Sequence, residues 1–132
     1  AATGEFTGTA PLATTKAAMT LTLSAGTGAF VTKSFTWYVT DLAWGSPPAN
    51  QSTKHGQWDS LSLSGDVTGG SGSYVYSAAG LPPNLKLTGS TISGTAGSTS
   101  TKGSYTVTVT ATDTSGPAAG ASVTTTFIWT IT

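Results

Sequence analysis

The side chains that could do chemistry are few and lie far apart along the chain. His55 is the only histidine, there is no Cys, and the acidic residues are Glu5, Asp41, Asp59, Asp66 and Asp113. A zinc site needs several His or Cys ligands, and a glycosidase needs two carboxylates across a cleft. The sequence has no Gly-x-Ser-x-Gly elbow, and the glycines at 69–72 lack the Lys of a phosphate loop. We therefore expect no enzymatic activity and no catalytic or cofactor-binding residue.

The composition limits the possible binding partners of the protein and its expected location in or outside the cell. Charged residues make up 8% of the chain, against about 25% in ordinary proteins. Since there are five Lys, no Arg and no net charge, nucleic acid is excluded as a partner. No apolar run approaches the roughly 20 residues of a membrane span, so we expect no membrane insertion. The absence of Cys fits a long-lived protein that is extracellular or on the cell surface. Because the chain begins at Ala1 rather than Met, we expect an upstream segment to have been removed.

Apolar and polar residues alternate with a period of two in several segments of the sequence. Apolar and hydroxyl residues alternate at 19–23 and 105–109, and aromatic residues take the apolar positions at 35–39 and 127–131. Such alternation is typical of half-buried strands. Turns rich in Gly and Pro separate these segments, and no stretch shows a period of 3.6. The pattern predicts an all-β antiparallel sandwich.

An internal repeat divides the chain. A shift of 86 residues aligns 5–25 with 91–111, where eight of the 21 positions are identical. After a six-residue insertion, 35–40 aligns with 127–132, and Trp37 falls on Trp129. Residues 1–40 are therefore predicted to be the back half of a repeat, 41–48 a junction, and 49–132 a complete repeat. In the half-repeat we expect about three strands, a short one at Phe6 and two over 18–25 and 30–40.

The complete repeat resembles a known family through three runs: Gly80-Leu81-Pro82-Pro83-Asn84-Leu85, Ile92-Ser93-Gly94-Thr95, and the segment from Gly103 to Asp113. These are similar to the bacterial immunoglobulin-like (cadherin-like, dystroglycan-type) repeats of secreted and cell-surface proteins. The resemblance covers about 46–132 well and 5–40 as a half copy. It implies an immunoglobulin-like (Ig-like) β-sandwich and brings no shared catalytic or ligand site. The sequence departs from the family at Asp59, where an apolar residue is usual, and at Thr27, which stands where the second copy has Asp113.

The alternation also predicts which side chains are buried. In the complete repeat these are Leu61, Tyr76, Leu85, Ile92, Val107, Val109, Phe127 and Trp129. Trp37 is assigned to the core with Trp129 because the two share a register. The inner residues of the half-repeat need a partner surface, and three outcomes stay open: packing on the complete repeat, disorder, or strands received from another chain.

Two kinds of ligand are considered. Sugar rings stack on flat aromatic side chains, and Tyr38, Trp44 and Trp58 are candidates for a stacking platform, although a junction Trp more often packs between modules. Calcium is a weaker candidate. Cadherin-like repeats can bind it at junctions, and here the junction offers Asp41 and Asp113, although a strand-end Asp more often caps a turn. We otherwise expect no cofactor and no metal.

Three functions remain. The first is a structural or adhesive Ig-like module of a secreted or surface protein. The second is a self-assembling fibre subunit, in which strands from a neighbour complete the half-repeat. The alternative is a carbohydrate-binding accessory module of an extracellular hydrolase. The expected partners are other copies of the chain or neighbouring Ig-like modules, with a polysaccharide as the alternative.

Overall fold

The structure, a computed structural model, describes residues 15–24, 26–96 and 102–132. This part of the chain is built from strands and turns, without a helix. Its strands are β1 (Thr15–Ser24), β2 (Phe30–Val39), β3 (Ala43–Trp44), β4 (Gln51–Thr53), β5 (Trp58–Ser62), β6 (Val67–Thr68), β7 (Tyr74–Ala79), β8 (Leu85–Thr88), β9 (Thr91–Thr95), β10 (Gly103–Asp113) and β11 (Ser122–Ile131). A search of the described residues for an apolar helix long enough to cross a membrane found none.

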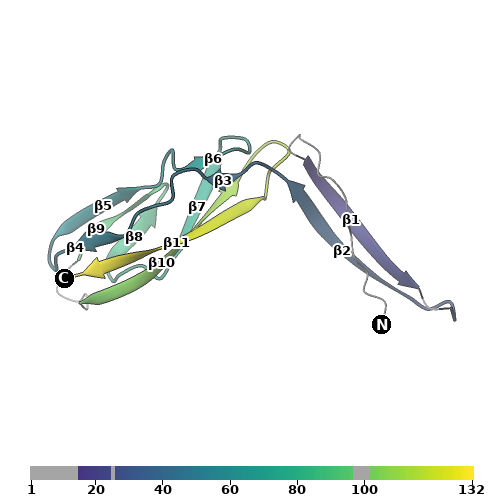
Figure 1. Cartoon of the computed structure of the whole chain (residues 1–132), viewed down its shortest axis with the longest axis horizontal. Helices are drawn as coiled ribbons and strands as arrows, with labels where there is room; N and C mark the ends of the chain where they lie inside the picture. Colours follow the sequence, from purple (N-terminus) through teal and green to yellow (C-terminus); the bar gives the residue numbers. More distant parts are fainter. Residues whose placement is uncertain (1–14, 25, 97–101) are drawn as a thin grey trace.

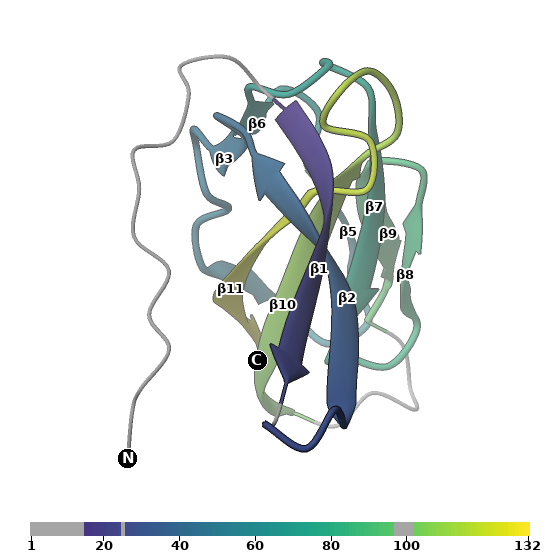
Figure 2. The ribbon, with the colours of Figure 1, turned by 90° about the vertical axis from the view of Figure 1, so that its right-hand side faces the viewer.

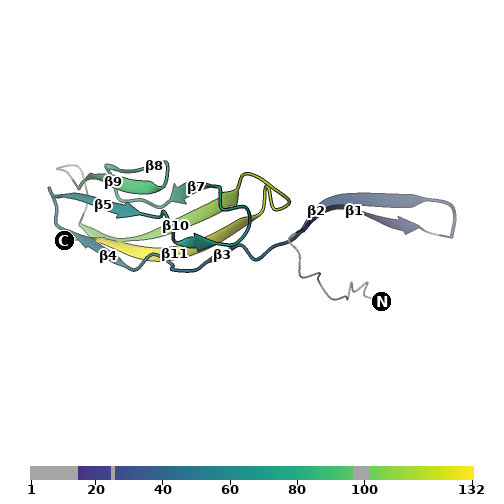
Figure 3. The ribbon, with the colours of Figure 1, turned by 90° about the horizontal axis from the view of Figure 1, so that it is seen from above.

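Two sheets form the sandwich. One has the strand order β4-β11-β10-β7 and the other the order β5-β9-β8, and Figure 3 shows them as two layers. The short β3–β6 pair forms a further two-stranded sheet. Neighbouring strands are antiparallel except β4, which runs parallel to β11. The predicted all-β Ig-like sandwich is confirmed.

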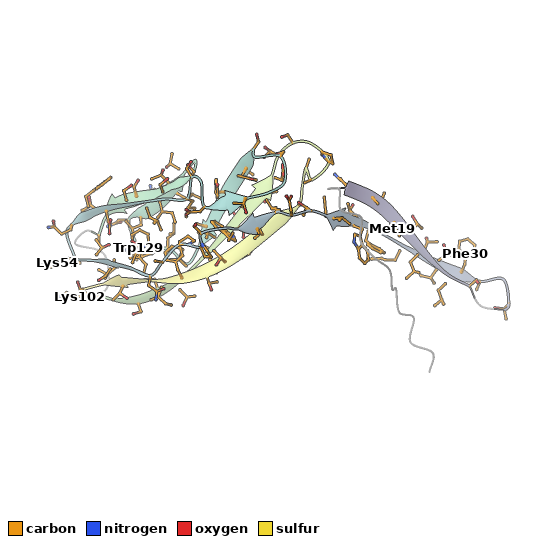
Figure 4. All side chains as sticks on the ribbon, turned by 45° about the horizontal axis from the view of Figure 1, so that its top comes forward. Met19, Phe30, Lys54, Lys102 and Trp129 are labelled. Atoms are coloured by element: carbon orange, nitrogen blue, oxygen red, sulfur yellow. The ribbon has the colours of Figure 1, made fainter. Side chains whose placement is uncertain are left out.

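The core follows from the alternation in β10 and β11. These strands pair so that Tyr105 lies opposite Trp129 and Val107 opposite Phe127, which brings their apolar residues to one face. The other sheet, β5-β9-β8, is the front sheet and covers that face, so Val107, Val109 and Trp129 are fully buried. Figure 4 shows Trp129 between the two layers. Six of the eight predicted core residues are buried, while Leu61 and Tyr76 are partly buried and pack against the core.

Truncating the middle of β10 tests this packing. We expect Val107→Ala or Val109→Ala to lower the free energy of unfolding by roughly 1–3 kcal/mol, because each removes buried methyl groups and leaves a small cavity. Urea unfolding followed by fluorescence measures the change. Val75→Ala is the control, since Val75 is exposed and its truncation should cost little. Equal losses for the three variants would contradict the assigned core.

The β1–β2 pair is a hairpin that projects from the end of the sandwich (Figure 1). Figure 2, a view along the long axis, shows its strands as a twisted ribbon. The two longer strands expected in the half-repeat are thus present, and Phe6 lies outside the described residues. The assignment of Trp37 to the core is wrong, because 49% of this side chain is exposed. Alternation decides which residues share a face of a strand pair, but it does not decide whether a second layer covers that face.

Candidate functional site

One face of the β1–β2 hairpin is apolar and exposed. Residues directly opposite each other in the pair share a face, and the register sets Met19 opposite Phe35 and Leu23 opposite Val31. Six large apolar side chains gather there, with exposures from 38% to 74%: Met19, Leu21, Leu23, Val31, Phe35 and Trp37. We call these six the apolar hairpin face. Figure 4 shows Met19 on this hairpin, well away from the sandwich.

The other face of the hairpin carries hydroxyl groups. Thr20 lies opposite Ser34, and their hydroxyl oxygens are 3.3 Å apart. Thr22 lies opposite Thr32 in the same row. Apart from exposed Phe30 on this side and Lys33 on the apolar side, the hairpin is a ribbon with one side suited to water and one side suited to burial.

The hairpin repeats the pattern of β10–β11 in a slightly different register. The sequence repeat aligns Met19 with Tyr105 and Trp37 with Trp129. Tyr105 pairs with Trp129, whereas Met19 pairs with Phe35, a difference of two residues. An even shift keeps the same residues on the same face. Trp129 is fully buried and Trp37 is not. The two hairpins therefore share one pattern of side chains, but in the part of the chain that the structure describes a second layer covers only the apolar face of β10–β11.

Contacts at its base tie the hairpin to the β10–β11 loop. The Lys16 Nζ donates a hydrogen bond of 3.2 Å to the Ala119 carbonyl oxygen. The same ammonium group lies 5.6 Å from the centroid of the Tyr38 ring, at cation–π distance. A Cβ atom at Gly120 would lie 2.7 Å from the Tyr38 hydroxyl oxygen, so the ring packs closely on this loop. These contacts use none of the side chains of the apolar hairpin face.

Asp41 and Asp113, the candidate calcium ligands, both hold the turn at 69–71. The Asp41 carboxylate accepts a hydrogen bond of 2.8 Å from the Gly70 N–H. The buried Asp113 carboxylate accepts bonds from the N–H and the hydroxyl of Ser71 and, at 3.0 Å, from the Ser115 N–H. Gly70 has a φ of +64°, and an added Cβ would collide with Asp113. Among the described residues no three His, Cys, Asp or Glu side chains are grouped as metal ligands. The calcium hypothesis stays a prediction.

These bonds set the ionisation of Asp113. Burial raises the pKa of the carboxyl, but hydrogen bonds from the Ser71 hydroxyl and from the Ser115 and Ser71 N–H groups lower it more, so the net pKa lies below the ordinary value of 3.8. The ionised form is thus favoured in the folded state. Its contribution to stability is complete above pH 3.8 and is lost as the pH falls through the lower pKa of the folded state.

Removing the Asp113 charge should destabilise the sandwich. We expect Asp113→Asn to lower the free energy of unfolding at pH 7 by about 1–3 kcal/mol, since the amide nitrogen cannot accept a bond from the Ser71 N–H. The loss should shrink as the pH falls below 3.8, where the carboxyl of the unfolded chain takes up a proton first, and it should be smallest below the lower pKa of the folded state. Urea unfolding from pH 2 to pH 7 measures both effects. A loss that stays constant over this range would contradict the assigned role.

The three aromatic candidates for sugar stacking occupy different environments. Tyr38 is half-buried at the base of the hairpin. The Trp44 indole N–H donates to the Val123 carbonyl oxygen at 3.2 Å, and its ring packs against Tyr76 and the core. Trp58 is 66% exposed at the start of β5. Tyr38 and Trp44 thus lie near the segment 119–123. The β5 strand begins beside the C-terminal end of β11, which Figure 1 shows at the end of the sandwich away from the hairpin.

Trp58 stands on a sheet face rich in hydroxyl groups. The register places Trp58 opposite Thr95, Ser60 opposite Ser93, and Ser62 opposite Thr91. Leu61, a predicted core residue, and Leu63 alternate with these residues and lie toward the core. A flat ring beside hydroxyl groups is a surface on which a sugar can stack and form hydrogen bonds. The role of Trp58 in sugar binding stays a prediction.

The structure also explains Asp59, the departure from the family pattern. The indole N–H of Trp129 donates a hydrogen bond of 2.8 Å to the hydroxyl of buried Thr53, and that hydroxyl donates to the Asp59 carboxylate. Thr53 is not among the residues that the sequence predicted for the core or for a site. The signal that could have indicated Thr53 is Asp59, six positions later. An acidic residue in a row of inward-facing apolar residues needs a hydrogen-bond partner. The bonds satisfy a buried indole, so Thr53 and Asp59 support the core.

Two facing sheets, a core along β10–β11 and a parallel β4–β11 edge define an Ig-like β-sandwich domain. A comparison with family models matches residues 43–132 to the family described as "Putative Ig domain". The match spans more than half of the chain, and the chain belongs to this family. The resemblance seen in the sequence is confirmed. No match was found among curated proteins.

Proposed function

We propose that the chain is a non-catalytic structural or adhesive Ig-like module of a secreted or cell-surface bacterial protein. In this proposal it associates with other copies or with neighbouring Ig-like modules through the apolar hairpin face. The observation that carries the proposal is the exposure of the six side chains of that face. Large contiguous apolar surfaces on soluble proteins mark interaction sites.

The energetics of a small hairpin support this proposal. An isolated two-stranded hairpin is at best marginally stable in water, because ordering each residue costs about 1–2 kcal/mol. Each strand of the hairpin has ten residues, and the contacts that tie it to the sandwich lie at its base. Burying the apolar hairpin face against a partner would offset the cost of ordering these strands.

Strand complementation is one way in which this association could continue from copy to copy. If strands of a neighbouring unit complete the half-repeat, each unit contacts the next through a different surface. Such head-to-tail contacts do not close on themselves and therefore build a fibre.

The carboxylates support a non-catalytic role. Asp41, Asp59 and Asp113 each accept hydrogen bonds from N–H or hydroxyl groups of their own domain. These bonds stabilise turns and strand ends, so each of these three carboxylates has a structural role.

Sedimentation equilibrium over a concentration series tests the proposal. The full chain should associate reversibly, and a chain that lacks residues 1–40 should remain monomeric, because the truncation removes the apolar hairpin face. The truncated chain keeps the residues that match the family, so its native unfolding transition serves as the control for folding. A full chain that stays monomeric at every concentration would overturn association through the hairpin.

Carbohydrate binding is the second candidate function, and the exposure of Trp58 beside a row of hydroxyl groups favours it. A glycan array identifies a binding polysaccharide. Trp58→Ala should then weaken binding roughly two- to tenfold, if stacking on the ring contributes about 0.5–1.5 kcal/mol, as a contact between two aromatic rings does. His55→Ala is the control, because His55 is exposed and outside the Trp58 row. Binding that survives Trp58→Ala unchanged would contradict this site.

A further inference from the structure

We infer that two copies of the chain pair with their apolar hairpin faces stacked on each other, as a symmetric dimer. This inference rests on the proposed association through the hairpin and specifies its occupant: the same face of a second copy. Two observations carry it, namely the covering strands that the structure describes and the exposed apolar area.

The strands that the structure describes favour face-to-face pairing over completion by an identical copy. The described chain has two hairpins of the same pattern, β1–β2 and β10–β11, but one front sheet, β5-β9-β8. That sheet already covers β10–β11, and Leu63 and Ile92 on one side and Trp129 on the other are fully buried. A copy that lent these strands to a neighbour would expose its own β10–β11. Pairing one hairpin face with another covers both faces and exposes neither core.

The exposed area suits a specific interface. The six side chains of the apolar hairpin face expose on the order of 600 Å², so a pair of copies would bury about 1,200 Å², which reaches the lower end of the range for specific interfaces. The rings of Phe35 and Trp37 lie side by side with their centroids 6.2 Å apart. Buried Trp side chains are common anchors of interfaces. Two sheets that stack face to face pack about 10 Å apart, which accommodates these side chains.

Charge on the hairpin sets the strength of the pair. Lys33 lies opposite Leu21, on the apolar side, and it is exposed. The residues from 15 to 40 include no Asp or Glu, so the hairpin itself offers no counter-charge to Lys33. In the dimer the Lys33 ammonium group must extend to the rim and lies on a surface shared with a second Lys33. Lys33 therefore weakens the pair, and added salt should strengthen it by screening.

The shape of the dimer follows from the position of the hairpin. The hairpin projects from one end of the sandwich (Figures 1 and 3). We infer an antiparallel pair, because parallel hairpins would bring the two bulky sandwiches to the same end; the antiparallel pair places the sandwiches at opposite ends of an elongated particle. Small-angle scattering of the dimer should show two separated lobes.

The sharpest experiment adds the same side chain on the two faces of β2. Lys33→Met removes the charge and enlarges the apolar hairpin face, and we expect it to lower the dimer dissociation constant roughly tenfold. Thr32→Met is the matched control, because Thr32 lies next to Lys33 on the hydroxyl face, opposite Thr22, and should leave the constant unchanged. Sedimentation equilibrium of the full chain measures both constants.

The outcomes separate this inference from the proposed function. A closed dimer with two lobes, tightened by Lys33→Met alone, supports both. A mass that grows without limit with concentration would overturn face-to-face pairing while leaving association through the hairpin intact. A dimer that responds equally to the two substitutions would also overturn the pairing, and a compact dimer would overturn its antiparallel arrangement. A monomer at every concentration for the full chain and both variants would overturn both.

Discussion

Trp129→Ala is expected to lower the free energy of unfolding by about 3–5 kcal/mol, whereas Trp37→Ala changes that of the monomer by less than about 0.5 kcal/mol. The two tryptophans occupy equivalent positions of the repeat. Trp129 is fully buried and bonded to Thr53, while 49% of Trp37 is exposed on the apolar hairpin face. The same truncation therefore creates a cavity in one hairpin and removes exposed surface in the other.

Urea unfolding at concentrations low enough to keep the chain monomeric measures this difference. The comparison is well matched, because both substitutions remove one indole from a strand that follows a hairpin turn. Similar losses for the two variants would show that the monomer buries Trp37 as well, and that its hairpin is covered by the rest of the chain.

The second large effect concerns association. Leu21→Asp is expected to weaken self-association by at least roughly a hundredfold, because pairing would bury an unpaired carboxylate among apolar side chains. Leu21 lies between Met19 and Leu23 on the apolar hairpin face. Sedimentation equilibrium of the variant, compared with the unmodified chain, gives the change in dissociation constant.

Thr22→Asp is the control for this prediction. It places the same charge one residue further along β1, on the hydroxyl face opposite Thr32. Association should survive this change, with at most a small loss from altered net charge. If both aspartates abolished association, or neither did, the apolar hairpin face could not be the contact surface.

The part of the fold that the sequence predicted is the part that local alternation determines. The strands around Val107 and Trp129 are long, alternate regularly and pair in a register that buries every second residue, so the pattern was sufficient there. The strands β3, β4 and β6 have only two or three residues each, which is too short for a period to appear.

The error at Trp37 has a different cause. Its strand shows the same alternation as the strand of Trp129, and both form hairpins with one apolar face. Whether that face is buried depends on a second sheet, which is a tertiary contact and leaves no mark on the alternation of the strand itself.

The candidate sites were predicted by residue type more than by geometry. Trp58 is exposed on its sheet as alternation required, whereas Trp44 bonds to Val123 through a contact 79 residues away in sequence. The roles of Asp113 and Thr53 likewise depend on bonds to distant residues, Ser71 and Trp129. Such long-range pairs have no spacing rule that one sequence can reveal.

Hydrogen exchange of the full chain at two concentrations tests the central claim most directly, since it reports separately on β1–β2 and β10–β11. At a concentration where the chain is monomeric, we predict strong protection of the β10–β11 amides and little protection of the β1–β2 amides. At a concentration where the chain associates, the β1–β2 amides should become protected while those of β10–β11 change little. Strong, concentration-independent protection of β1–β2 in a monomer would contradict the account, because the hairpin would then need no partner.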